Sequence, residues 1–166
     1  MTRILVAGVG NIFRGDDAFG VEVARRLART EPTLGADVVD FGIRGLDLAF
    51  ALTDRYDIAI LIDAAPRGEE PGTLSVVEPQ LDAPDENAFV DAHDLDPAAV
   101  LRSIARLGGK GAKTLLVACE PLTLGGEEGA MGLSDPVAAA VEPATRLVKR
   151  LVASLREAEP LKGDAR

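Results

Sequence analysis

Residues 3–20, RILVAGVGNIFRGDDAFG, decide the fold class, because they predict a strand, a glycine-containing turn and the start of a helix. The run RILVA at residues 3–7 is mainly apolar and is followed by glycine, as expected for a strand buried on both faces. Residues 17–29 then carry apolar side chains at helical spacing, which predicts a helix with one apolar face. A buried strand followed by an amphipathic helix is the first unit of an α/β domain.

Strand-like and helix-like segments alternate along the rest of the chain. We predict further strands at residues 37–41, 57–62, 72–77 and 113–118, and helices at residues 46–52, 96–107 and 134–155. The strand at 72–77 is expected to lie at an edge of the sheet. The pattern predicts one α/β domain over residues 1–155, a three-layer arrangement with a twisted, mostly parallel sheet of about five strands and helices on both faces. Residues 156–166 are polar and are expected to form a frayed tail.

The composition argues against several classes of protein. The chain has 166 residues, of which 47% are hydrophobic, and its formal net charge is −9. Nucleic-acid binding depends on Lys and Arg that neutralise phosphates, so we expect neither a nucleic acid nor an anionic membrane surface as a partner. No apolar run is long enough to span a bilayer, no signal peptide is recognisable, and the single cysteine fits a reducing compartment. These features predict a cytoplasmic protein.

Several acidic side chains and the only histidine follow the ends of predicted strands. Asp16 and Asp17 come after the first strand, Asp40 ends the second, Asp63 follows the third, and His93 lies in the loop before the helix at 96–107. In open α/β sheets, ligands bind outside the carboxyl ends of the strands, where the strand order reverses. Carboxylates and an imidazole at that edge would suit a divalent transition metal with positions left open for substrate.

Each of these residues also has an ordinary structural interpretation. Asp16 and Asp17 could cap the helix that follows them, since a carboxylate accepts hydrogen bonds from the free N–H groups there. Asp40 and Asp63 could close turns at strand ends. A single histidine in a loop is more often solvated than metal-bound. The metal-site hypothesis therefore depends on the convergence of these residues at one edge of the sheet.

A dinucleotide-binding fold is the rival interpretation of the same segment. Gly8 and Gly10 have the spacing of its glycine fingerprint, and Asp40 stands where a ribose-binding acid would stand. Phe13 occupies the place of the third glycine, however, and would obstruct the close approach of helix and strand. Asp16 and Asp17 would place negative charge beside a pyrophosphate. We consider this alternative the weaker one.

The motifs along the chain resemble those of the nickel–iron hydrogenase maturation endopeptidases. The matching motifs, in this order and spacing, are GVGN at 8–11 with DD at 16–17 and Gly20, DFG at 40–42 with Gly45, IDA at 62–64, AH at 92–93 and GLS at 132–134. The resemblance implies a phosphorylase/hydrolase-like fold. It also implies an enzyme that removes a short C-terminal extension from a hydrogenase large-subunit precursor after nickel insertion.

The resemblance also implies a metal site and its occupant. By position, the family's metal ligands fall on Asp17, Asp63 and His93. The implied metal is nickel that the substrate already carries, and other divalent metals are expected to substitute for it. Where many members have Glu, this chain has the shorter Asp17, so its loop must approach the metal slightly more closely.

The segment after the second strand is implied to contact the substrate, through Gly42, Arg44 and Gly45. This chain has Ile43 and Arg44 where many members of the family carry a threonine after the glycine. The change removes a hydroxyl and adds a cation, which affects substrate recognition more than the metal site. The class of hydrogenase is therefore not assigned from this segment.

The inventory of reactive side chains favours metal-assisted hydrolysis over other protease chemistry. Cys119 ends a predicted strand and is expected to be a buried, inert thiol. One histidine cannot supply the H-E-x-x-H helix of a conventional zinc protease. A metal ion can instead polarise the scissile carbonyl or activate water. Asp40 is a candidate general base, although it could equally orient a neighbour. A non-catalytic nickel-sensing or nucleotide-binding module stays open as the alternative function.

Overall fold

A computed structural model describes residues 1–32, 34–78 and 111–158 of the chain. Its elements are, in chain order, β1 (Ile4–Val9), the 3-10 helix η1 (Gly15–Ala18), α1 (Phe19–Thr30), β2 (Asp37–Gly42), α2 (Gly45–Phe50), the π-helical turn η2 (Ala51–Arg55), β3 (Ile58–Ala64), β4 (Leu74–Val77), β5 (Lys113–Cys119) and α4 (Asp135–Glu157). The helix predicted at 96–107 lies outside the described residues. The alternation of strands and helices predicted from the sequence is confirmed in the described ranges.

The five strands form one mixed sheet in the order β2-β1-β3-β5-β4. Strands β2, β1, β3 and β5 are parallel, and β4 pairs with β5 in the antiparallel direction at the edge of the sheet. The chain leaves β1 toward β2 on one side and later places β3 on the other side of β1. The strand order therefore reverses between β1 and β3, and the ligand site of such a sheet is expected at the carboxyl ends of these two strands.

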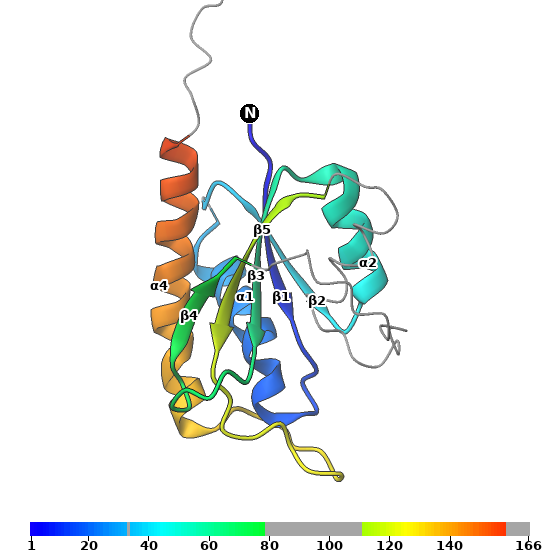
Figure 1. Cartoon of the computed structure of the whole chain (residues 1–166), viewed down its shortest axis with the longest axis vertical. Helices are drawn as coiled ribbons and strands as arrows, with labels where there is room; N and C mark the ends of the chain where they lie inside the picture. The colour runs from blue at the N-terminus through cyan, green and yellow to red at the C-terminus, as the bar shows by residue number, and fades with distance from the viewer. Residues whose placement is uncertain (33, 79–110, 159–166) are drawn as a thin grey trace, which may run out of the picture.

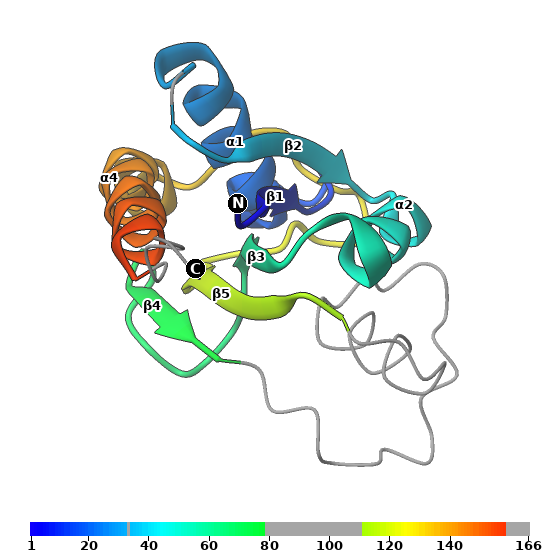
Figure 2. The ribbon, with the colours of Figure 1, turned by 90° about the horizontal axis from the view of Figure 1, so that it is seen from above.

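Helices cover both faces of the sheet, as predicted (Figures 1 and 2). Helices α1 and α4 pack on one face, where Phe19, Val23 and Val148 contact alternate residues of the strands, such as Val6 and Ile62. On the opposite face, α2 and η2 cover a second core that contains Leu5, Ala7, Leu48, Leu52 and Leu61. The central strands are buried on both faces, which explains their uninterrupted apolar sequences.

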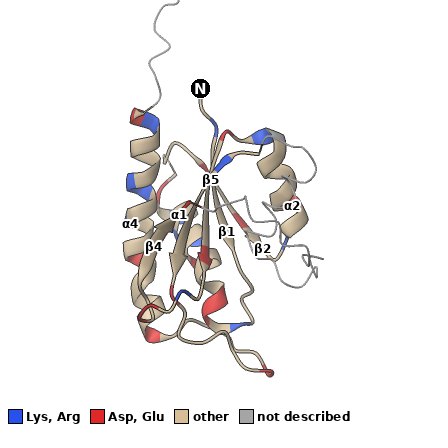
Figure 3. Ribbon diagram, in the orientation of Figure 1, with Lys and Arg blue, Asp and Glu red and all other residues tan. Residues whose placement is uncertain are grey.

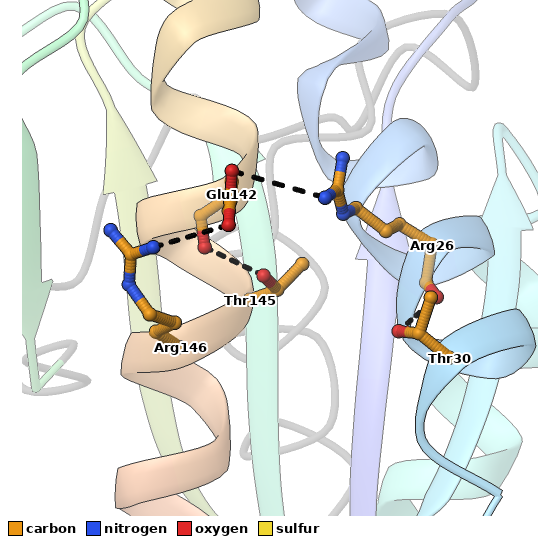
Figure 4. A network of polar contacts seen from close by, with 5 residues as sticks. All are labelled: Arg26, Thr30, Glu142, Thr145 and Arg146. Carbon is orange, nitrogen blue, oxygen red and sulfur yellow. Dashed lines mark hydrogen bonds and ion pairs between the residues drawn. The ribbon is translucent and has the colours of Figure 1, made fainter.

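Helices α1 and α4 lie side by side, and a surface network joins them (Figure 4). Glu142 Oε1 accepts from Arg146 Nη1 at 3.3 Å, and Glu142 Oε2 lies 4.0 Å from Arg26 Nη2. Exposed pairs of this kind add little to stability, so the helices are held mainly by the apolar residues beneath them.

Helix α4 continues to Glu157, two residues into the segment 156–166 that the sequence assigned to a frayed tail. There Arg156 donates to the carbonyl oxygens of Thr2 and Gly35.

Two candidate site residues lie inside strands and not after them. Asp63 is the second-last residue of β3, which extends beyond the predicted end at residue 62. Asp40 lies within β2, two residues before the strand ends. Strands β2 and β3 are longer than predicted because their pairing with β1 and β5, respectively, continues to their last residues.

Among the described residues, no helix combines the length and the apolar character that a membrane span requires.

Candidate functional site

Asp17 is held in a fixed orientation by the loop that follows β1. Its Oδ2 atom accepts a hydrogen bond of 2.8 Å from the backbone N–H of Asn11, and its own N–H donates to the carbonyl of Arg14 at 3.2 Å. The side chain of Asn11 in turn accepts from the N–H of Phe13 at 2.9 Å, which closes a tight turn. Asp17 is half-buried and belongs to η1, which is a 3-10 helix and not the first turn of the predicted α-helix.

The glycines of this segment allow main-chain segments to approach one another. A Cβ on Gly10 would lie 1.8 Å from the carbonyl oxygen of Asp17, and a Cβ on Gly20 would lie 2.0 Å from that of Ile62. The close contact between the first helix and the sheet is therefore made at Gly20. Phe13, at the place of a third fingerprint glycine, is 61% exposed in the loop before η1. The glycines thus serve internal packing, and this geometry gives no support to a phosphate cradle.

Asp63 lies on the neighbouring strand, at the point where the strand order reverses. It is 8% exposed, its Oδ1 atom is fully buried, and it lies opposite Ala118 of β5. The 3-10 helix that carries Asp17 contacts β3, which carries Asp63. The structure therefore brings the elements of these two predicted ligands together at one edge of the sheet. The parallel strands point to the lower end of the molecule in Figure 3, where several acidic segments are coloured red.

For Asp16, the alternative of a helix cap, which the sequence left open, is wrong. The donors to the carboxylates of Asp16 and Asp17 lie outside η1 and α1, so neither side chain caps these helices. Asp16 is instead fully buried and accepts hydrogen bonds from Leu122, Thr123 and Ser134. Burial raises the pKa of this carboxyl, but the hydrogen bonds to the carboxylate outweigh that effect and hold the pKa below its ordinary value.

Asp40 is engaged in contacts with two arginines. Its Oδ2 atom forms an ion pair of 3.1 Å with Nε of Arg25, and its carbonyl oxygen accepts from Nη2 of Arg44 at 2.5 Å. The Arg44 guanidinium also lies 5.6 Å from the centre of the Phe41 ring. Asp40 stands on β2, one strand away from the point where the strand order reverses. Both the carboxylate and the carbonyl oxygen of Asp40 are therefore engaged by arginine side chains.

A cavity of about 360 Å³ lies between the loop after β1 and the end of β2. Two of the predicted substrate-contacting residues, Gly42 and Arg44, line it together with Asp40, and Ile43 adds an exposed apolar side chain. Gly45 is not among the lining residues and is the first residue of α2. The volume is within the range of small-ligand pockets and would accept a few atoms of a peptide side chain or backbone.

Of the three predicted metal ligands, the described ranges contain two, Asp17 and Asp63. His93 lies outside them, and within them no group of three or more His, Cys, Asp or Glu side chains can hold a metal ion alone. The donor set that the described residues do offer is two carboxylates, Asp17 and Asp63, on contacting elements. Two carboxylate oxygens completed by an imidazole nitrogen fit a divalent transition metal with open coordination positions.

Cys119 is buried at the end of β5, as the sequence predicts. Burial, together with the negative charges of Asp16 and Glu120, raises the pKa of its thiol from 9.0 to about 12. At pH 8 the thiolate fraction of Cys119 in the native protein is therefore roughly a thousandfold lower than that of a solvated cysteine.

We expect a disulfide reagent to label Cys119 in the native protein at pH 8 far more slowly than in urea. Rapid, stoichiometric labelling of the folded protein would contradict the inert role.

Comparisons with known proteins identify the family and the fold of the chain. A family model described as HycI, hydrogenase maturation protease, matches residues 21–151. The chain is 31% identical over 157 residues to the hydrogenase 2 maturation protease of Escherichia coli, with 93% of this chain and 92% of that protein covered. It is also similar in structure to the hydrogenase maturating endopeptidase HybD from E. coli, with a TM-score of 0.68, 27% identity and coverage of 95% and 94%. The [NiFe] hydrogenase maturation protease HycI from Thermococcus kodakarensis gives the same TM-score and identity, with coverage of 92% and 93%.

Proposed function

The chain belongs to the hydrogenase maturation protease family, and from this premise we propose that it removes the C-terminal extension of a nickel–iron hydrogenase large-subunit precursor after nickel insertion. The single observation that carries the proposal is the placement of Asp17 and Asp63 on contacting elements, where the strand order reverses. We place the reaction in the cytoplasm, since the chain has one cysteine and that cysteine is buried.

We assign Asp17, Asp63 and His93 as the ligands that receive the metal, which is the nickel of the precursor. This ion would polarise the scissile carbonyl or activate water when the precursor is bound. The protein contributes the orientation of the ligands. The N–H of Asn11 fixes one oxygen of Asp17, and Asp63 is a buried residue of β3 that lies opposite Ala118 of β5. A preorganised pair of carboxylates would seat the substrate at little cost in reordering the site.

We assign substrate contacts to Gly42, Arg44 and Gly45, which lie where β2 ends and α2 begins, and a positioning role to Asp40. Arg44 lines the cavity, and its contacts with the Asp40 carbonyl and the Phe41 ring keep its guanidinium at the wall. A guanidinium there offers hydrogen-bond donors to peptide carbonyl or carboxylate oxygens. The ion pair between Asp40 and Arg25 holds the strand end from which this loop departs.

Arg44→Ala is expected to raise the KM for the precursor about tenfold, the loss of one charge-assisted contact, and to leave kcat nearly unchanged. Arg26→Ala is the matched control, because Arg26 is an exposed arginine of α1 whose ion pair is with Glu142 of α4. Steady-state cleavage assays over a range of precursor concentrations measure both constants. A loss confined to kcat would assign Arg44 to the chemical step and contradict a recognition role.

The decisive experiment is mass spectrometry of a nickel-loaded large-subunit precursor after incubation with the protein. Loss of one defined C-terminal peptide is the expected result, and the nickel-free precursor should stay intact. A non-catalytic nickel-sensing or nucleotide-binding module would leave both precursors at full length. That outcome, with a folded protein and a nickel-loaded precursor, would refute the proposed activity.

A further inference from the structure

Asp16 is a buried carboxylate that the proposed chemistry does not use, although it is adjacent to the ligand Asp17. Its Oδ1 atom accepts a hydrogen bond of 2.7 Å from the N–H of Ser134. Its Oδ2 atom accepts three more, from the N–H of Leu122 at 2.8 Å, the N–H of Thr123 at 3.1 Å and the hydroxyl of Ser134 at 2.8 Å. One fully buried carboxylate thus receives four donors, all of them from residues more than a hundred positions away in the sequence.

These donors belong to the long loop between β5 and α4. Backbone hydrogen bonds join the same two segments at Asp16 and at the residues just before it. The N–H of Asp16 donates to the carbonyl oxygen of Thr123 at 3.0 Å. Ala130 makes two such bonds: its carbonyl oxygen accepts from the N–H of Gly15 at 2.9 Å, and its N–H donates to the carbonyl oxygen of Phe13 at 2.9 Å. The chain just before Asp17 is therefore joined to the segment 122–134, and Asp16 contributes its carboxylate to these contacts.

We propose that Asp16 is a positioning residue for the metal site: its carboxylate fastens η1 to the segment 122–134 and so fixes the place of Asp17. The inference rests on the proposed role of Asp17 as a metal ligand. The two residues are consecutive in a four-residue 3-10 helix, so a displacement of Asp16 moves Asp17. The backbone of Asp17 is also in close contact with Gly10, which leaves few alternative positions for it.

Asp16→Asn is the most direct variant, because it keeps the size of the side chain. Whichever way its amide is turned, its NH₂ group faces at least one N–H donor that the carboxylate had accepted. Ser134→Ala is a milder variant, since it removes the hydroxyl and keeps the backbone donor. Thr145→Val is the matched control for stability. It removes a buried hydroxyl group that donates a hydrogen bond of 2.6 Å to the carbonyl oxygen of Glu142, within α4 and away from the site.

The test is calorimetric titration of each folded variant with Cd²⁺ alone, well below its thermal midpoint. We expect Asp16→Asn to weaken the affinity about 10- to 100-fold, the effect usual for residues that orient metal ligands. Ser134→Ala should weaken it less, and Thr145→Val should leave it unchanged. In the cleavage assay, Asp16→Asn should lower kcat/KM, because the nickel that the ligands receive is carried by the precursor.

Two results would overturn the inference, and they differ in what else they affect. If Asp16→Asn binds Cd²⁺ like the wild type while Asp17→Asn does not, Asp16 serves stability alone and the proposed metal site stands. If Asp17→Asn also binds like the wild type, the proposed metal site itself fails, and the positioning role fails with it. Should Asp16→Asn not fold, Ser134→Ala decides: reduced affinity supports the positioning role, and wild-type affinity overturns it.

Discussion

Asp17→Asn is expected to lower the rate of precursor cleavage by about a hundredfold or more and to leave the fold intact. The substitution removes an anionic ligand, whose loss should exceed the 10- to 100-fold effect usual for residues that only orient ligands. The amide oxygen of Asn can still accept the hydrogen bond from the N–H of Asn11, so the loop keeps its shape. Asp63→Asn should have the same effect on cleavage, since it removes the second carboxylate.

Cleavage rate, Cd²⁺ affinity and thermal midpoint, measured on one set of proteins, test this expectation. Asp57→Asn is the control, because Asp57 is an exposed carboxylate that precedes β3, at the opposite end of the strand from Asp63. It accepts from the N–H of Arg3 at 2.8 Å and takes no part in the proposed site. If Asp17→Asn cleaves the precursor at a rate close to that of Asp57→Asn, Asp17 is not a metal ligand.

The fold and the pair of acidic strand ends could be predicted from the sequence because their signals are local. Apolar runs such as that of β3 mark strands buried on both faces, and the alternation with helices fixes a parallel sheet. Parallel strands then place their carboxyl ends at one edge, which is why the acidic residues that follow these strands were expected to lie close together. The choice of Asp17 and Asp63 among them as metal ligands came from the family resemblance. The location of that site between β1 and β3 follows from the strand order.

The role of Asp16 could not be predicted, because its partners are distant in the sequence. Asp16 and Asp17 are identical residues next to each other at the start of a helical segment, and local rules assign both to capping. Their actual difference is direction: Asp16 points to donors 106 to 118 residues away, and Asp17 to a donor six residues away. Only the docking of the segment 122–134 against η1 distinguishes them.

The dinucleotide fingerprint, which was the weaker interpretation of these glycines, requires a geometry that does not apply here. It would place the close contact between helix and strand at position 13, because its helix begins directly after the turn. The chain instead inserts the loop 11–14 and η1 before α1, so the contact is made at Gly20. What the motif did indicate correctly is that main-chain segments meet closely in this region.

Gly10→Ala is expected to lower both the stability of the fold and the affinity of the metal site, because Gly10 packs against the backbone of Asp17. Its φ of +146° is rarely adopted by residues with a side chain, and the new Cβ would lie 1.8 Å from the carbonyl oxygen of Asp17. Backbone strain and overpacking of this kind each cost about 1–3 kcal/mol, so we expect a loss of about 2–6 kcal/mol in the free energy of unfolding. The segment must move to relieve the contact, and Cd²⁺ affinity should therefore fall together with stability.

Two other glycines separate the contributions to this effect. Gly126→Ala should be nearly neutral, since its Cβ meets nothing within 4 Å and its φ is not in the positive range that disfavours side chains. Gly132→Ala isolates the backbone term, because its φ is +89° and its Cβ also meets nothing within 4 Å. Urea unfolding and Cd²⁺ titration of the three variants give the comparison. If Gly10→Ala loses no more stability than Gly132→Ala and binds Cd²⁺ normally, the loop can relax around the added methyl group, and the position of Asp17 does not depend on its contact with Gly10.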